Sequence, residues 1–168
     1  KEDSIAALAE TKGVSELEVI YDEFLKNGGT NLVYACFTPY DNHKLDFVER
    51  AYSLKSSVAG GSDGGAHCGL ICDASMPTTN LSHWARDREA GKKIPIELIV
   101  RKQTKDTAET YGLFDRGEIK TGMLADLNII DFENLNVTHP KMVYDLPMGG
   151  RRLIQNSFGY LATVKSGE

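Results

Sequence analysis

The chain has no long hydrophobic run and no excess of basic residues, and each shortage excludes a class of protein. Its apolar runs span only a few residues, whereas a helix needs about 20 to cross a bilayer. The net charge is −5, from 19 Lys and Arg against 24 Asp and Glu, which disfavours contact with a phosphate backbone. We therefore expect neither a membrane nor a nucleic-acid partner.

Cysteine is also scarce. Cys36, Cys68 and Cys72 are an odd number without CxxC spacing, which argues against a disulfide framework and favours a reducing compartment. We therefore predict a cytoplasmic protein. Cys68 and Cys72 lie near His67, but structural zinc sites use closed sets of four ligands, so ordinary thiols are the simpler interpretation. The sequence has no HxH or HExxH motif either, and it predicts no metal site within these residues.

What is present is typical of a folded domain. Hydrophobic residues make up 41% of the chain and charged residues 26%, both close to the averages of soluble globular proteins. The length of 168 residues suits one domain, but it excludes a complete (β/α)8 barrel, which needs roughly 250 residues.

Hydrophobic periodicity in the first two thirds predicts alternating helices and short buried strands. Ser15 and Glu18 form a capping box that opens one of these helices. The predicted helices span residues 4–11, 16–29, 41–54, 81–88 and 95–112, and the predicted strands span 32–37 and 57–61. Strand, helix, strand and helix in this order predict a right-handed parallel βαβ arrangement.

The pattern changes at Asp115. A turn-rich segment is followed by short alternating stretches that predict strands at 126–131, 143–146, 153–156 and 161–164. We therefore predict an α/β domain over residues 1–114 and part of an all-β domain over residues 115–168.

The segment that contains the strongest candidates for functional residues is Gly60-Gly61-Ser62-Asp63-Gly64-Gly65-Ala66-His67. Asp63 directly follows a predicted buried strand, and active sites of parallel α/β folds lie at the carboxyl ends of strands. A carboxylate there can act as a general acid or base or as a weak metal ligand. The alternative is that Asp63 caps a turn. His67 can likewise contact a substrate or be an ordinary loop histidine.

These residues resemble the last-strand motif of the amidohydrolase superfamily, in the branch of the N-acyl-D-amino-acid deacylases (D-aminoacylases). Two further stretches resemble that family's final barrel helix and its return into a small β-sandwich. They are Val100–Leu113 and Asp115–Asp131, which includes Asp-Arg-Gly, Thr-Gly and Ala-Asp-Leu in the family's order. The resemblance therefore covers nearly the whole chain.

The resemblance implies the last βα units of a TIM-like (β/α)8 metal-dependent hydrolase barrel, followed by an incomplete β-sandwich. In such enzymes one or two zinc ions, held by residues of earlier strands, lower the pKa of a bound water. Asp63 matches the aspartate that takes a proton from this water and passes it to the leaving nitrogen. Gly64, Gly65 and His67 match residues near the substrate. The zinc ligands would lie upstream of Lys1, so none is expected within this chain.

The implied substrate is a small-molecule amide, in first place an N-acyl-D-amino acid. The family's loop after the motif carries a basic residue for the substrate carboxylate, whereas residues 68–79 contain no Lys or Arg. Another C–N bond, such as that of a cyclic amide, is therefore an alternative target. A non-catalytic binding or scaffolding module is the alternative from another class. We expect this C-terminal portion to be inactive alone, and to associate with itself or with the missing N-terminal portion through open strand edges.

Overall fold

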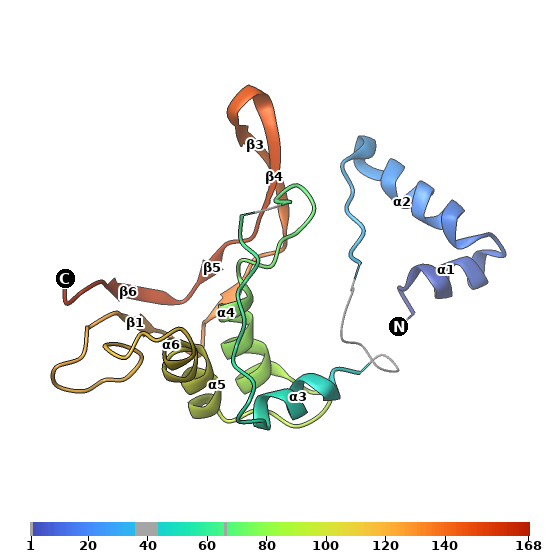
Figure 1. The fold of residues 1–168 in the computed structure, drawn as a ribbon. Coiled ribbons are helices and arrows are strands. Elements are labelled where there is room, and N and C mark those ends of the chain that lie inside the picture. The colour runs from blue at the N-terminus through green and yellow to red at the C-terminus, as the bar shows by residue number, and fades with distance from the viewer. Residues whose placement is uncertain (1, 36–43, 66) are drawn as a thin grey trace. The chain divides into compact units, whose positions relative to one another are not determined.

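A computed structural model describes residues 2–35, 44–65 and 67–168. By its internal contacts the chain divides into two compact units, residues 1–48 and residues 49–168 (Figure 1). The chain mixes helices and paired strands, as expected for an α/β protein, and all strands of the described residues lie between 127 and 164. The domain boundary predicted at residue 114 differs from the boundary between these two units. It rests on the change from a helical to a strand pattern in the sequence, and it stays a prediction.

The first unit contains a helical hairpin. Helix α1 (Ile5–Lys12) starts at Ser4, whose hydroxyl accepts a hydrogen bond from the Ala7 amide. Helix α2 (Glu16–Gly29) starts at Ser15, whose hydroxyl accepts from the Glu18 amide, as the capping box predicts. Positive φ angles at Asn27 and Gly28 end its regular part. The two helices pack against each other, and they contain the buried side chains Ala9 and Val19.

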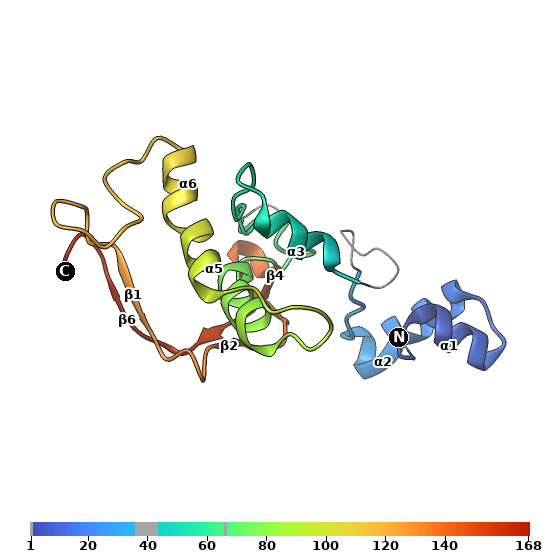
Figure 2. The same cartoon turned by 90° about the horizontal axis from the view of Figure 1, so that it is seen from below.

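The remaining helices of the described residues lie in the second unit, except that α3 (Asp46–Ser53) begins at the end of the first. They are α3, α4 (Met76–Thr79), the π-helix η1 (Asn80–Asp87), α5 (Ile96–Gln103) and α6 (Lys105–Thr110). Figure 2 shows α5 and α6 joined end to end. The single helix predicted over residues 95–112 is therefore interrupted at Thr104, whose φ and ψ are −116° and −86°. Periodicity could not reveal this break, because one non-helical residue leaves the apolar pattern on both sides intact.

The strands form a nested antiparallel ribbon of three short pairs. β1 (Leu127–Ile130) pairs with β6 (Tyr160–Val164), β2 (Asn136–Val137) with β5 (Ser157–Phe158), and β3 (Lys141–Leu146) with β4 (Gly150–Ile154). The turn between β3 and β4 is the short 3-10 helix η2 (Pro147–Gly149). Figure 1 shows β3 and β4 at one end of this ribbon and β1 with β6 at the other. The strands predicted at 126–131, 143–146 and 161–164 are thus confirmed as β1, β3 and β6, whereas the strand predicted at 153–156 begins earlier, as β4 at Gly150, and ends at Ile154.

The two predicted parallel strands are the main correction. Residues 32–35 and 57–61 belong to no strand, while residues 36–43, which include Cys36, the end of the first predicted strand and the start of the predicted helix 41–54, lie outside the described residues. A parallel strand requires a neighbour that supplies its hydrogen bonds. Within the described ranges residues 57–61 have no such neighbour, so their apolar sequence alone does not make a strand.

The second unit is held together by Arg86 and a small apolar core. The Arg86 guanidinium donates to the carbonyl oxygens of Phe132, Glu133 and Leu135, and its Nε and Nη2 atoms also donate to the Asp87 carboxylate. This links η1 to the turn between β1 and β2. The buried apolar side chains of this unit are Leu81, Trp84, Ile94, Ile99, Ala108 and Leu135. The core therefore lies between η1, α5, α6 and the turn between β1 and β2, which contains Leu135.

Candidate active site

Asp63 lies on an exposed loop directly after the apolar residues 57–61. Its φ is +49°, in the left-handed region, and His67 has a similar φ of +51°. Residues other than glycine rarely adopt this region, and they cluster there at functional sites. Gly65, with φ +142°, has a backbone that only glycine adopts without strain. The loop thus combines a carboxylate with a backbone that bulky residues disfavour.

The Asp63 side chain is exposed. It makes no hydrogen bond or ion pair with the other residues that the structure describes. The alternative role as a turn cap requires a bond to a nearby amide; Ala66, whose amide is one candidate, lies outside the described residues, so the role of Asp63 stays a prediction. His67 is exposed too, and its carbonyl oxygen accepts from the amides of Leu70 and Ile71, at 2.8 and 2.9 Å.

The segments on either side of the loop are anchored in the second unit. On the upstream side the Thr107 hydroxyl of α6 donates to the Ala59 carbonyl oxygen at 3.3 Å. On the downstream side the Leu153 amide of β4 donates to the Cys68 carbonyl oxygen at 2.6 Å. Further along, Thr78 of α4 bonds to the hydroxyl groups of Ser157 and Tyr160, at 3.0 and 2.8 Å. The β ribbon therefore fixes the segment that follows Asp63.

Metal ligands do not gather in the described residues. No group of three or more His, Cys, Asp or Glu side chains there has a geometry that could hold a metal ion. Burial, and then the neighbouring Asp73 carboxylate, raise the pKa of the Cys72 thiol above its usual value. A protonated thiol is a poor ligand. Asp63, His67, Cys68 and Cys72 therefore do not form a metal site by themselves.

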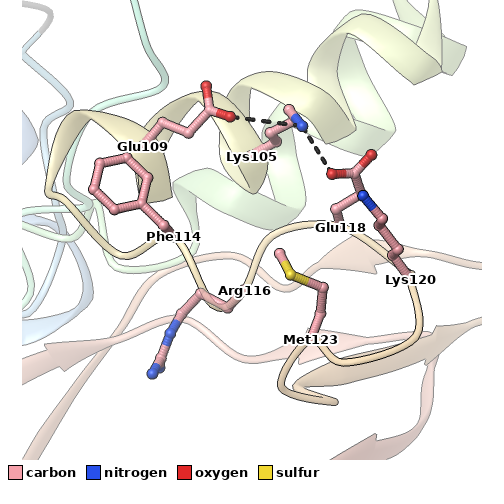
Figure 3. Close-up of a pocket in the computed structure, with 7 residues that line it drawn as sticks. All are labelled: Lys105, Glu109, Phe114, Arg116, Glu118, Lys120 and Met123. Carbon is pink, nitrogen blue, oxygen red and sulfur yellow. Dashed lines mark hydrogen bonds and ion pairs between the residues drawn. The ribbon is translucent and has the colours of Figure 1, made fainter.

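A pocket of about 170 Å³ lies away from this loop, between α6 and residues 114–123. Figure 3 shows the Lys105 amine between two carboxylates, with Glu118 at 2.8 Å and Glu109 at 3.6 Å. Arg116 points away from Lys105 in the same view and pairs with Asp115 and Asp126. The ion pairs of Lys105 therefore link α6 to the following segment.

The sequence predicted no functional role for Arg151, which lies beside Gly69. A Cβ atom on Gly69 would lie 3.6 Å from the Arg151 carbonyl oxygen and 3.9 Å from Arg151 Nε. Its neighbour Arg152 is bound by both carboxylate oxygens of Asp145, at 2.8 and 2.7 Å. Neighbouring residues of a strand point to opposite faces, so pairing of Arg152 leaves Arg151 on the loop side. The two adjacent arginines directly before the strand predicted at residues 153–156 were the signal that could have revealed it.

No helix of the described residues has both the length and the apolar character required to cross a membrane. Comparison with known protein families gives one match, to the model of the amidohydrolase family, over residues 2–168. Neither the curated proteins nor the solved structures gave a match to the chain. Because the family match extends over almost every residue, the chain belongs to the amidohydrolase family, a family of hydrolases that act on amide and related C–N bonds and commonly bind metals.

Proposed function

We propose that the chain is the C-terminal part of a zinc-dependent amidohydrolase of the D-aminoacylase type, and that Asp63 is its proton shuttle. The observation that carries this proposal is the exposed Asp63 carboxylate, without a partner among the described residues, in a strained, glycine-flanked loop directly after an apolar segment. In an amidohydrolase-family chain, such a carboxylate is suited to general acid–base work.

The proposed barrel accounts for the apolar residues that the chain leaves exposed. Residues 57–61 become the last barrel strand once a neighbouring parallel strand supplies hydrogen bonds. Large apolar side chains such as Tyr34 and Ile119 are 83% and 88% exposed. Exposed apolar surface of this kind is typical of faces that another part of a protein covers. Residues 115–168 would then contribute part of a β-sandwich.

In the proposed reaction Asp63 accepts a proton from the attacking water. The same carboxyl group then donates this proton to the leaving nitrogen, so that the amide is hydrolysed to a carboxylate and an amine. Gly64 and Gly65 leave room beside the carboxylate because they have no side chains, and His67 contacts the substrate.

Zinc is part of the proposal, although the described residues do not fit a zinc site. When bound in the complete enzyme, zinc would lower the pKa of a water molecule. Its ligands would come from other parts of the enzyme. The free thiols Cys68 and Cys72 support a reducing, cytoplasmic location.

We propose an N-acyl-D-amino acid as substrate, and Arg151 supports this choice. Residues 68–79 contain no cation, but Arg151 lies against Gly69 within that loop. A guanidinium group binds a carboxylate well through two parallel hydrogen bonds.

Replacing Arg151 by alanine is expected to raise KM for an N-acyl-D-amino acid about tenfold or more, because loss of a charge-assisted hydrogen bond costs roughly 1.5–3 kcal/mol. Steady-state kinetics with the acid and with its neutral carboxamide provide the measurement, and only the acid should be affected. Arg152→Ala, which removes a cation already paired with Asp145, is the control. Equal effects on both substrates would contradict a carboxylate contact.

The proposed function is tested by the hydrolysis of N-acyl-D-, N-acyl-L-amino acids and cyclic amides by the complete enzyme, before and after zinc removal. We expect zinc-dependent hydrolysis of the N-acyl-D-amino acid. Preferential ring opening of cyclic amides would show that the substrate is a cyclic amide rather than an N-acyl-D-amino acid. The 168-residue chain alone should contain no zinc and hydrolyse none of them. Binding of a small amide by this chain alone, without activity in the complete enzyme, would favour a non-catalytic module.

A further inference from the structure

Lys102, near the C-terminal end of α5, is a buried cation that the proposed reaction does not use. Only 3% of the residue is exposed. Its amine donates to the carbonyl oxygen of Leu54 at 2.6 Å and to the carbonyl oxygen of Ser57, and it lies 3.7 Å from Asp106 Oδ2. An ammonium group has three N–H donors; two of them bond the Leu54 and Ser57 carbonyl oxygens, and the Asp106 carboxylate adds an ion pair.

The two carbonyl groups belong to the chain that leads to Asp63. Leu54 directly follows α3, and Ser57 opens the apolar residues 57–61. Thr107 adds a weaker contact further along, since its single hydroxyl hydrogen is shared between the Lys102 carbonyl oxygen at 2.6 Å and the Ala59 carbonyl oxygen at 3.3 Å. Lys102 and Thr107 thus hold the segment 54–59 at three carbonyl groups.

The charge of Lys102 makes this attachment specific. A buried ammonium group is costly unless acceptors surround it, so the segment 54–57 must keep its carbonyl groups turned toward Lys102 in the folded state. These contacts fix the start of residues 57–61, and they do so in addition to any sheet hydrogen bonds that a neighbouring strand supplies in the complete enzyme. Asp63 has no polar contact of its own within the described residues, so its position follows from that of the segment before it.

We propose that Lys102 is a positioning residue for Asp63, which it serves by fixing the segment 54–59 from α5. This inference rests on the proposed role of Asp63 as proton shuttle. Lys102 lies outside the catalytic loop and far from Asp63 in the sequence, and it would nevertheless control the position of the Asp63 carboxylate.

The test is the replacement Lys102→Met in the complete enzyme, which keeps the side chain's length and removes its donors. We expect kcat to fall by about tenfold to a hundredfold, since small misplacements of a catalytic group cost up to about 10²-fold. KM should stay within about twofold of its original value, because Lys102 does not contact the substrate. Hydrogen exchange of the amides of residues 58–65 should become faster.

Lys105→Met is the matched control. It is the same chemical change three residues further on, at an amine that makes only surface ion pairs with Glu109 and Glu118, and it should alter neither kcat nor exchange at 58–65. Unchanged kcat and unchanged exchange in Lys102→Met would overturn the inference. A parallel rise in KM with constant kcat would also overturn it, because that result indicates a binding role.

If Lys102→Met does not fold, as judged by circular dichroism, Thr107→Val decides the question. It removes the hydroxyl that holds Ala59 and keeps the shape of the side chain, so it should lower kcat and speed exchange at 58–65 to a smaller extent. Unaltered values in this variant would overturn the inference. The proposed function fails separately, if Asp63→Asn retains turnover, and the exchange measurement still tests the attachment in that case.

Discussion

Replacing Asp63 by asparagine is expected to lower kcat of the complete enzyme by about 10²- to 10⁴-fold, the usual contribution of a positioned general acid or base. Asparagine has nearly the same shape, but its amide cannot accept and return a proton at neutral pH. Because Asp63 makes no ion pair with another described residue, the change should leave folding intact. Zinc content should stay the same, since the proposed ligands lie elsewhere.

The measurement is kcat for an N-acyl-D-amino acid, together with metal analysis and a thermal melt of each variant. Asp73→Asn is the matched control, because Asp73 is another exposed carboxylate in the segment that follows the loop, and it should keep kcat. Near-normal turnover in Asp63→Asn would rule out the proton-shuttle assignment. Loss of zinc together with activity would instead indicate that Asp63 is a metal ligand.

Replacing Gly159 by alanine is expected to destabilise the chain by about 2–5 kcal/mol. Gly159 connects β5 to β6 with φ +95°, and a Cβ there would lie 2.6 Å from Leu135 Cα and 2.9 Å from the Leu135 amide nitrogen. Left-handed backbone costs an alanine roughly 1–2 kcal/mol, and overpacking against buried backbone adds about 1–3 kcal/mol. Leu135 is completely buried, so the clash has no simple relief.

Gly122 provides the control for this change. Its φ is +91°, almost equal to that of Gly159, yet a Cβ there would have nothing within 4 Å. Gly122→Ala should therefore cost only the backbone contribution of roughly 1–2 kcal/mol. Urea denaturation of both variants measures the difference. Equal losses of stability would show that the close approach of Gly159 to Leu135 is not maintained in solution.

Local signals predicted much of this structure. Ser15 and Glu18 located the start of α2, and alternation around Leu127–Ile130 located β1, because both features depend on neighbours in the sequence. The strand predicted at residues 57–61 failed for the opposite reason. Its hydrogen bonds must come from another strand, which the residues themselves do not encode.

In the candidate site, too, the local features were predicted from the sequence and the long-range contacts were not. The glycines around Asp63 mark a loop with unusual backbone angles, and the structure has such angles at Asp63 and Gly65. The approach of Arg151 to Gly69 and the attachment of Ser57 by Lys102 were not predicted. Both join segments about 45 to 82 residues apart in the sequence, and such pairs follow from the tertiary fold rather than from local pattern.

The nested pairing of the ribbon has a consequence for the order of folding. β3 and β4 are joined by the three residues of η2, whereas β1 and β6 close around everything between them. Since the entropy lost on loop closure grows with loop length, the ribbon should form from the Pro147–Gly149 turn outward. The bonds from Ser75 and Thr78 to the ribbon span 80 and 79 residues, and they can form only on strands that already exist. We therefore expect the contacts that anchor the segment after Asp63 to form after the ribbon itself.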